Sequence, residues 1–458
     1  MKPAATIPKS SGRPGAEPAA LTVAAVALAA AVVTVAGTIG PDARWLSALG
    51  RSIVSLGRLP HGIPYAVASS RGWHNVPVLA ELVFRGLQSG LSDRGLLGAQ
   101  VVAALAAVTL IQRDARRLGA TDAGAAMAVT IVLIAGLLAF VGIRAQLFSL
   151  VLFPALVSLL RSDERRPSRR IWLVVPLLAL WSNLHGAALV GLGVALVYLL
   201  VGRARRHPLE GAAVATASVL ALCATPTPLG TPAYYAGVVT SEAARRGYGL
   251  WAPLSVHSGF DLLLIGGAAI LLAGFIVARP SLWQLAVAAA LVVLTVHAAR
   301  NGIWLLMFLA PPAATALRIG VQPRPALGHC VALVLAAAAV AGFVRGPLDV
   351  GAKAQLISRA IADARGRPIL AEPAAAEQIA QAGGHVWVSN PLDAFRRSDQ
   401  RLYLDWLQGL PAGDRALGRG TEVVVRDGSP ADRRLSQDHR FSVAASDGRF
   451  RLFVGSRS

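Results

Sequence analysis

The stretch PAALTVAAVALAAAVVTVAGTIGPDARW, residues 18–45, decides the class of fold. Its first charged side chain is Asp42, near its end. A run of about 20 apolar residues is long enough for a helix to cross the hydrocarbon core of a membrane. We find no small-residue cleavage site after the run, so we interpret residues 18–40 as a retained transmembrane anchor followed by an acidic residue.

The rest of the chain repeats this pattern. Hydrophobic residues make up 55% of the 458 residues and charged residues only 15%, a composition typical of a polytopic membrane protein. We predict an all-α fold with about eleven transmembrane helices in residues 18–344. The apolar stretches lie near residues 18–40, 95–112, 122–142, 145–160, 171–183, 186–202, 209–225, 260–278, 282–299, 302–317 and 326–344.

The formal charge of +20 is spread in short arginine runs between the apolar stretches. We interpret these runs as topology signals and exclude a nucleic-acid surface, which needs a basic patch. The runs follow even-numbered spans, so we predict a multi-pass cell-membrane protein with residues 1–17 as a disordered cytoplasmic tail and residues 345–458 outside. The runs are Arg113, Arg116 and Arg117; Arg161, Arg165, Arg166, Arg169 and Arg170; Arg203, Arg205 and Arg206; Arg279; and Arg318 and Arg324.

Polar clusters stand where four odd-numbered spans end, so all four are expected at the outer membrane face. They are Asp42, Arg144, Asn183–His185 and Arg300–Asn301. This shared face predicts a working site there.

The first external segment, residues 41–94, is too long for a simple turn. Its apolar side chains recur at helical spacing and predict an amphipathic helix along the outer membrane surface. After a break at proline and glycine residues, residues 76–87 return to the interface. Asp42 is therefore expected at the membrane boundary. The apolar positions of the surface helix are Trp45, Leu49, Ile53 and Leu56.

Several motifs resemble those of the bacterial GT-C glycosyltransferases, membrane enzymes that use polyprenyl-linked sugar donors. They are PDARWLSALGRSIVSLGRLP (41–60), GWHNVPVLAELVF (72–84), RAQLFSLVLF (144–153), LWSNLHGAALVGLG (180–193) and HAARNGIWLLMFLAPP (297–312). The resemblance implies a GT-C fold, a polyprenyl-phosphate-linked sugar as partner, and an acidic residue that acts at the acceptor just after the first span. Asp42 occupies that position.

The chain departs from the relatives' pattern at two places. Pro77–Leu79 stands where relatives commonly have Glu-Trp-Leu, and Leu250–Ala252 lacks the acidic residue often found beside the tryptophan. A second carboxylate is thus missing at both places. We assign no metal ligand. A divalent cation is a possible cofactor, but the sequence shows no second carboxylate at these places to bind it.

A sugar on a polyprenyl phosphate presents its scissile bond at headgroup level, where cations must hold the phosphate as negative charge develops. Arg144 and Arg300 are the candidate phosphate ligands, because a guanidinium donates two parallel hydrogen bonds and keeps its charge. Asp42 is the candidate base for an acceptor hydroxyl. We further expect His185 to contact the phosphate or sugar and Asn183 to orient it.

Aromatic residues gather in the external segment 226–259. Tyr234 and Trp251 are candidate substrate-positioning residues, because aromatic faces stack on sugar rings. Asn301 is a further candidate for positioning the substrate. The alternative is that the aromatic residues belong to an interfacial belt.

Structural alternatives stand beside the other assignments. Arg144 and Arg300 are also compatible with boundary arginines that extend to lipid headgroups. Asp42 is also compatible with an N-cap of the surface helix. Residues 183–186 are also compatible with a tight turn between helices.

Residues 345–458 have soluble character and predict a small extracytoplasmic α/β domain. Strands are expected at 368–371, 385–389, 422–426, 441–445 and 449–454, and helices at 373–382 and 393–408. Its polar and aromatic residues are candidates to contact a polymeric acceptor; the alternative is that Asp393 starts a helix and the aromatic side chains form the core. These candidates are Asn390, Asp393, Asp399, Asp405 and Trp406.

We expect a glycosyltransferase that moves a sugar from a polyprenyl-phosphate donor to an extracytoplasmic glycan, lipid or protein by an inverting, base-assisted reaction. The alternative is a catalytically degenerate GT-C-like membrane scaffold or carrier for lipid-linked sugars. A secondary transporter is a weaker third hypothesis, because coupling sites usually lie near mid-bilayer. The transferase requires Asp42 and at least one of Arg144 and Arg300 to meet in one cavity.

Overall fold

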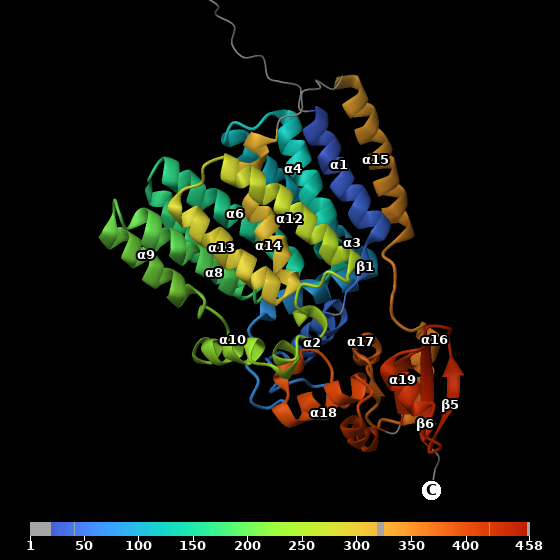
Figure 1. Cartoon of the computed structure of the whole chain (residues 1–458). Coiled ribbons are helices and arrows are strands. Elements are labelled where there is room, and N and C mark those ends of the chain that lie inside the picture. The colour runs from blue at the N-terminus through green and yellow to red at the C-terminus, as the bar shows by residue number, and fades with distance from the viewer. Residues whose placement is uncertain (1–19, 41, 318–324, 421, 456–458) are drawn as a thin grey trace, which may run out of the picture.

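The computed structural model describes residues 20–40, 42–317, 325–420 and 422–455. The predicted tail at 1–17 lies outside these residues. Figure 1 shows a bundle of helices at one end and a smaller unit of helices and strands at the other. The bundle contains α1 (Ala20–Ala36), α3 (Val78–Arg117), α4 (Asp122–Ala135), α5 (Leu137–Val141), α6 (Gln146–Arg165), α7 (Val174–Ser182), α8 (Ala188–Val197), α9 (Pro208–Ala221), α12 (Gly259–Val277), α13 (Leu282–His297), α14 (Gly302–Ala316) and α15 (Pro325–Arg345).

Each of the eleven predicted spans falls on a helical segment of this bundle. Among the described residues, four helices are both long and apolar enough to cross a membrane: α3, α6, α12 and residues Ala326–Arg345 of α15. The polytopic membrane fold is confirmed, and the number of crossings stays a prediction.

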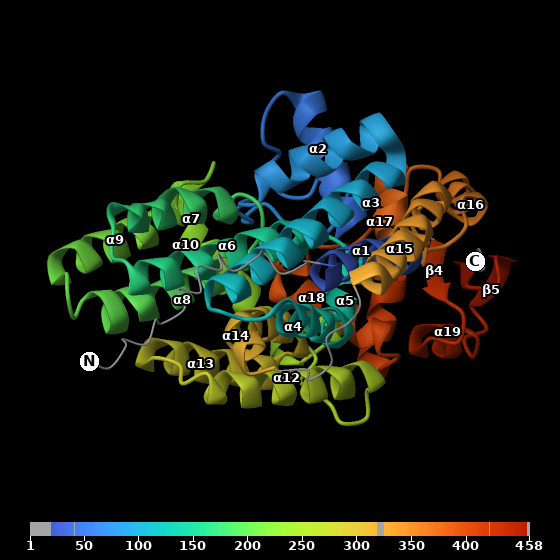
Figure 2. The ribbon, with the colours of Figure 1, turned by 90° about the horizontal axis from the view of Figure 1, so that it is seen from above.

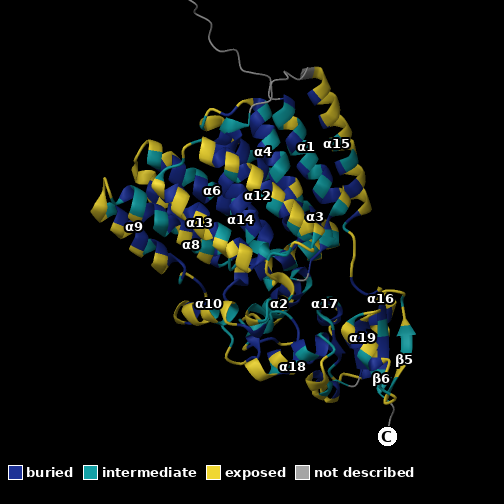
Figure 3. Ribbon diagram, viewed as in Figure 1, coloured by how far each residue is buried: buried dark blue, intermediate teal, exposed yellow. Residues whose placement is uncertain are grey.

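Burial follows the position of each helix in the bundle. Helix α14 lies in the interior, with every residue from Gly302 to Ala314 buried. Large apolar side chains are instead exposed along α12, α13 and α15, at the outer surface of the bundle (Figure 3). So many exposed apolar side chains are expected where lipid, not water, is the solvent.

Two arginines from the predicted topology runs lie inside the bundle, contrary to their expected place in loops. Arg161 pairs with Asp114 at 2.8 Å, and Arg203 pairs with Asp163. All four side chains are almost fully buried. A buried charge is costly unless it is paired, so these ion pairs explain how the arginines stay inside.

A short parallel strand pair joins the ends of two distant segments. β1 (Thr38–Ile39) follows α1, and β2 (Gly142–Ile143) precedes α6. Beyond the pair, the amide of Gly40 donates to the carbonyl of Ile143 at 2.9 Å. The two chain segments that continue from these strands are therefore held side by side.

The segment 41–94, which is predicted to be external, contains the expected amphipathic helix, α2 (Ala43–Leu56). The second half of this segment was expected only to return to the interface. Instead, α3 begins there and continues into the bundle. A break in α3 at Ser92, with φ of 55°, separates the outer part from the inner part. The same end of the bundle also carries α10 (Thr231–Val239), α11 (Glu242–Arg245) and the 3-10 turn Gly249–Trp251. Figure 2 shows the molecule from above.

The C-terminal unit is the predicted α/β fold. Its sheet has the order β3-β4-β6-β5, with β3 parallel to β4 and the other pairs antiparallel. The expected strand 385–389 is absent from this four-stranded sheet; Val386 forms isolated bridges to Ile369 and Ala66. The elements are β3 (Leu370–Ala371), β4 (Glu422–Arg426), β5 (Phe441–Ser446), β6 (Phe450–Gly455), α16 (Ala354–Ala364), α17 (Pro373–Gln381), α18 (Arg397–Leu407) and α19 (Pro430–Leu435).

Candidate active site

The paired strands β1 and β2 bring Asp42 and Arg144 together. Asp42 follows β1 and Arg144 follows β2, and both side chains line one cavity. Although Asp42 directly precedes α2, its carboxylate makes no capping hydrogen bond with that helix. The capping alternative thus has no contact to support it, and the carboxylate is available to the cavity.

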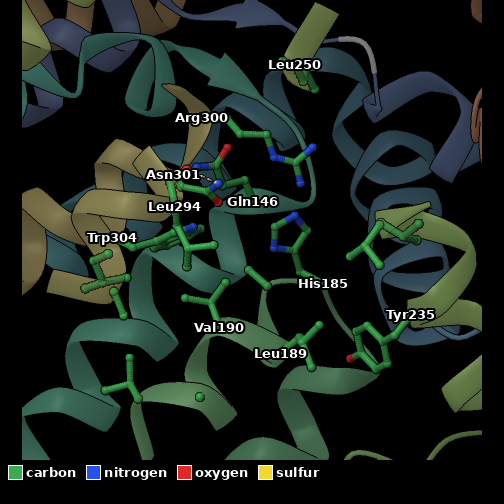
Figure 4. A pocket seen from close by; sticks show the side chains of 18 of the residues that line it. Gln146, His185, Leu189, Val190, Tyr235, Leu250, Leu294, Arg300, Asn301 and Trp304 are labelled. Atoms are coloured by element: carbon green, nitrogen blue, oxygen red, sulfur yellow. Dashed lines mark hydrogen bonds between the residues drawn. The ribbon is translucent and has the colours of Figure 1, made fainter. Parts of the chain in front are cut away.

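This inner cavity has a volume of about 380 Å³. At one end it is polar, with Asp42, Arg144, His185 and Arg300 in its wall; Figure 4 shows the guanidinium of Arg300 and the ring of His185 pointing toward one another. Away from this end the wall is apolar and comes from α8, α10 and α13. The apolar lining residues are Leu189, Val190, Val194, Val197, Val238, Val239, Val287, Ala290, Leu291 and Leu294.

The two arginines of the cavity have no carboxylate partner within ion-pair distance in the described part of the chain. Arg144 donates to the side chain of Gln146, and its buried Nε has no hydrogen-bond partner. The guanidinium of Arg300 lies over the ring of Trp251, 4.4 Å from its centroid. Arg161 and Arg203, by contrast, have carboxylate partners inside the bundle. The cavity therefore offers two guanidinium groups to an external anion.

His185 is oriented by a short hydrogen-bond chain. Trp181 Nε1–H donates to Ser149 Oγ at 2.6 Å, and Ser149 Oγ lies 2.7 Å from His185 Nδ1. The Ser149 hydroxyl has no other hydrogen-bond acceptor among the described residues, so it donates to Nδ1. A neutral His185 then carries its proton on Nε2, where it is available as a donor to an anion or a sugar oxygen.

A second, outer cavity of about 610 Å³ lies against the inner one. The two share Asp42, His185, Trp251 and Arg300. The opposite wall of the outer cavity comes from the C-terminal unit. The other polar and aromatic lining residues of the outer cavity are Trp45, Trp73, Tyr234, Ser241, Tyr248, Asn390, Asp393 and Tyr403.

The remaining predicted positioning residues fall in different places. Asn301 and Trp251 line the inner cavity, and Tyr234 lines the outer one. Asn183 is not among the lining residues of either cavity. Its amide donates to the carbonyls of Ala179 at 2.8 Å and Ala224 at 2.7 Å. The structure thus gives Asn183 a place in the connection between helices, as the tight-turn alternative expects.

Two lining residues of the inner cavity were given no role from the sequence. These residues are Gln146 and Tyr235. Gln146 could have been predicted from the sequence, because it is a polar residue only two positions after Arg144. Asp393 was named as a candidate to contact an acceptor, with a helix start as the alternative. Helix α18 begins only at Arg397, and Asp393 lies in the 3-10 turn Leu392–Ala394 and lines the outer cavity. Burial raises the pKa of Asp393 to about 6, and the charge of Asp42 contributes to this shift.

The fold of these elements is similar to that of two solved structures, in agreement with the GT-C-like fold predicted from the sequence. ArnT from Cupriavidus metallidurans, solved with bound undecaprenyl phosphate, superimposes with a TM-score of 0.53 at 14% identity, over 95% of this chain and 98% of ArnT. The arabinofuranosyltransferase AftD from Mycobacteria superimposes with a TM-score of 0.51 at 17% identity, over 96% of this chain and 42% of AftD. This chain therefore spans less than half the length of AftD. No protein-family model and no curated protein matches the sequence.

Proposed function

We propose that this membrane protein is a glycosyltransferase that uses a polyprenyl-phosphate sugar as donor and an extracytoplasmic acceptor. One observation carries the proposal: a carboxylate and two guanidinium groups without carboxylate partners line one cavity that continues as an apolar groove. The similarity to ArnT and AftD supports it at the level of the fold. In this proposal the N-terminus is cytoplasmic and the C-terminal unit extracytoplasmic.

The inner cavity suits a donor with a charged head and an apolar tail. The phosphate would bind Arg144 and Arg300, and the Nε2–H of His185 would donate to one of its oxygens. The first prenyl units would lie in the groove between α8, α10 and α13, where aliphatic side chains form the wall. The sugar would then project toward the outer cavity, beside Trp251.

The chemistry follows from this placement. An acceptor hydroxyl oxygen attacks the anomeric carbon from the side opposite the phosphate, and Asp42 takes the hydroxyl proton. The bond between the anomeric carbon and the phosphate oxygen breaks, and the polyprenyl phosphate leaves with that electron pair. The two guanidinium groups stabilise the charge that develops on the leaving phosphate. The reaction inverts the anomeric configuration because it is a single displacement.

The alternative is a scaffold or carrier for lipid-linked sugars built on the same helices. A scaffold does not require a carboxylate beside the cation pair. Asp42, Arg144 and Arg300 all line the inner cavity, which supports the transferase over the scaffold.

The test is donor turnover by the purified full chain in lipid nanodiscs. A panel of polyprenyl-phosphate sugars is offered with a mixed glycan extract as acceptor, and released polyprenyl phosphate is measured by mass spectrometry. The proposal expects release with at least one donor by the wild type and almost none by Arg300→Gln. Binding of the donors without release by the wild type would favour the carrier.

A further inference from the structure

The C-terminal unit is fixed against the outer face of the bundle by contacts from two sides. The amide of Val67 donates to the carbonyl of Val386 at 2.9 Å, in a strand-like contact with the first outer segment. Arg44 pairs with Asp349 at 2.9 Å, and on the other side Arg246 pairs with Asp405 at 2.7 Å. The unit therefore forms a fixed wall of the outer cavity.

Asp393 is the carboxylate that this wall contributes to the cavity. It forms no ion pair with any described residue, and it lies in the 3-10 turn Leu392–Ala394, ahead of α18. Asp405 lies in the same unit, but its carboxylate is engaged by Arg246. Asp393 is thus a carboxylate of the cavity wall for which the structure provides no cation.

The opposite wall supplies hydrogen-bond donors and aromatic faces. The buried indole N–H of Trp45 has no hydrogen-bond partner, and that of Trp73 lies near Asp393 without a well-aligned hydrogen bond. Both indoles line the cavity, as do Tyr234 and Tyr248. A buried donor without a partner is costly, so the Trp45 indole favours a ligand that accepts a hydrogen bond from it.

We propose that the outer cavity binds a carbohydrate part of the acceptor and that Asp393 is an acceptor-binding residue. This inference rests on the proposed function, because it names the acceptor's chemical class. Sugar hydroxyls donate to a carboxylate and accept from an indole N–H, and the C–H faces of a sugar ring pack on aromatic side chains. A purely apolar acceptor group would leave the Trp45 indole N–H without a partner and the Asp393 carboxylate without a donor from the ligand.

Asp42 completes the geometry of this subsite. It lines both cavities, and the carboxylate of Asp393 is close enough for the charge of Asp42 to affect its pKa. A sugar held by Asp393 in the outer cavity would therefore have a hydroxyl within reach of Asp42. The donor, bound at Arg144 and Arg300, would approach that hydroxyl from the inner cavity.

The test is a binding measurement that does not depend on turnover. Methyl α-mannoside, methyl α-glucoside, methyl β-galactoside and methyl α-arabinofuranoside are added to the full chain in nanodiscs, and binding is followed by saturation-transfer NMR. Cyclohexanol, with a ring of similar size but one hydroxyl, is the apolar control ligand. Asp393→Asn is compared with Asp399→Asn, a matched change in the same unit at a residue that does not line the cavity.

We expect at least one glycoside to bind more tightly than cyclohexanol, and Asp393→Asn to weaken it about tenfold while Asp399→Asn leaves it unchanged. Equal binding by both variants, or no glycoside bound above cyclohexanol, overturns the inference. Donor turnover by the wild type alongside such a result would keep the proposed function. If glycoside binding depends on Asp393 but the wild type turns over no donor, the carbohydrate subsite stands and the proposed transferase activity is contradicted.

Discussion

Asp42 and Arg144, about a hundred positions apart in the sequence, each follow one strand of the same two-residue parallel pair. The register Thr38 with Gly142 and Ile39 with Ile143 fixes their relative position. The base and one phosphate ligand of the proposed reaction are therefore positioned by backbone hydrogen bonds, independently of their own side-chain contacts.

Gly40 does not line the cavity, and a change there disturbs the strand pair directly. A Cβ at this position would lie 2.8 Å from the carbonyl oxygen of Ile143, too close for either backbone to stay in place. We expect Gly40→Ala to cost about 1–3 kcal/mol of stability and to lower transfer by up to about a hundredfold. Gly86→Ala, with open space around its new Cβ, is the control in the same transfer and thermal-unfolding assays. Full activity of Gly40→Ala would show that the strand pair does not set the geometry.

The arginines are expected to act as guanidinium forks and not only as charges. Arg144→Lys and Arg300→Lys keep the charge but lose bidentate binding, so each should lower kcat/KM for the donor by about 10- to 100-fold. Arg245→Lys, an exposed arginine outside both cavities, should have no effect. Steady-state kinetics with varied donor concentration measure this, and unchanged kcat/KM in both lysine variants would leave the arginines as boundary residues.

Ser149 should act through His185. Ser149→Ala removes the hydroxyl that receives Trp181 Nε1–H and donates to His185 Nδ1. We expect about tenfold slower transfer, and a double variant with His185→Gln that is no slower than His185→Gln alone. Ser182→Ala, which removes a hydroxyl bonded to the backbone of Ala179, is the control. If the losses of the two single variants add up in the double variant, the hydrogen-bond chain does not orient the imidazole.

Gly193 lies in the wall of the apolar groove of the inner cavity, and a Cβ there would meet open space. Gly193→Leu should therefore fill the groove and not disrupt packing. We expect turnover of donors with long prenyl chains to fall at least about tenfold, while donors with one or two prenyl units are affected less. Gly266→Leu, a matched change in α12 whose Cβ also meets open space, should affect neither. Equal losses with short and long donors in Gly193→Leu would place the tail elsewhere.

Asp393 should reduce stability at neutral pH. Its pKa of about 6 in the folded protein lies above the usual value of 3.8, so folding favours the protonated form. Stability is therefore lost as the pH rises from about 4 to 6. Asp393→Asn should gain as much as about 3 kcal/mol at pH 8 and nothing below pH 4. Thermal unfolding at both pH values checks this. Destabilisation by Asp393→Asn at pH 8 would instead indicate a structural role for the carboxylate.

Much of the fold was predictable because apolar length and arginine placement are local signals. The predicted spans coincide with helical segments, and the α2 helix follows from the spacing of its apolar residues. The burial of Arg161 and Arg203 was missed, because an arginine beside a span looks the same whether it lies in a loop or pairs with Asp114 or Asp163. Only the packing of neighbouring helices distinguishes the two.

The site was predictable only in part for a related reason. Asp42, Arg144, His185 and Arg300 were predicted to lie together because each is a polar residue at the end of an apolar stretch, and all four line the inner cavity. Asp393 was one of five candidates named in the soluble unit, where carboxylates are common, so nothing local distinguished it from Asp399 or Asp405. Its place in the cavity depends on how the C-terminal unit docks against the outer segment.

The central claim is that Asp42 is the base of a sugar transfer from a polyprenyl-phosphate donor. The most direct measurement is the rate of that transfer by the full chain in nanodiscs, for the wild type and Asp42→Asn, with donor binding measured in the same preparations. We predict transfer by the wild type and a loss of about a thousandfold in the variant with donor binding retained. Equal transfer rates in the two proteins would contradict the account.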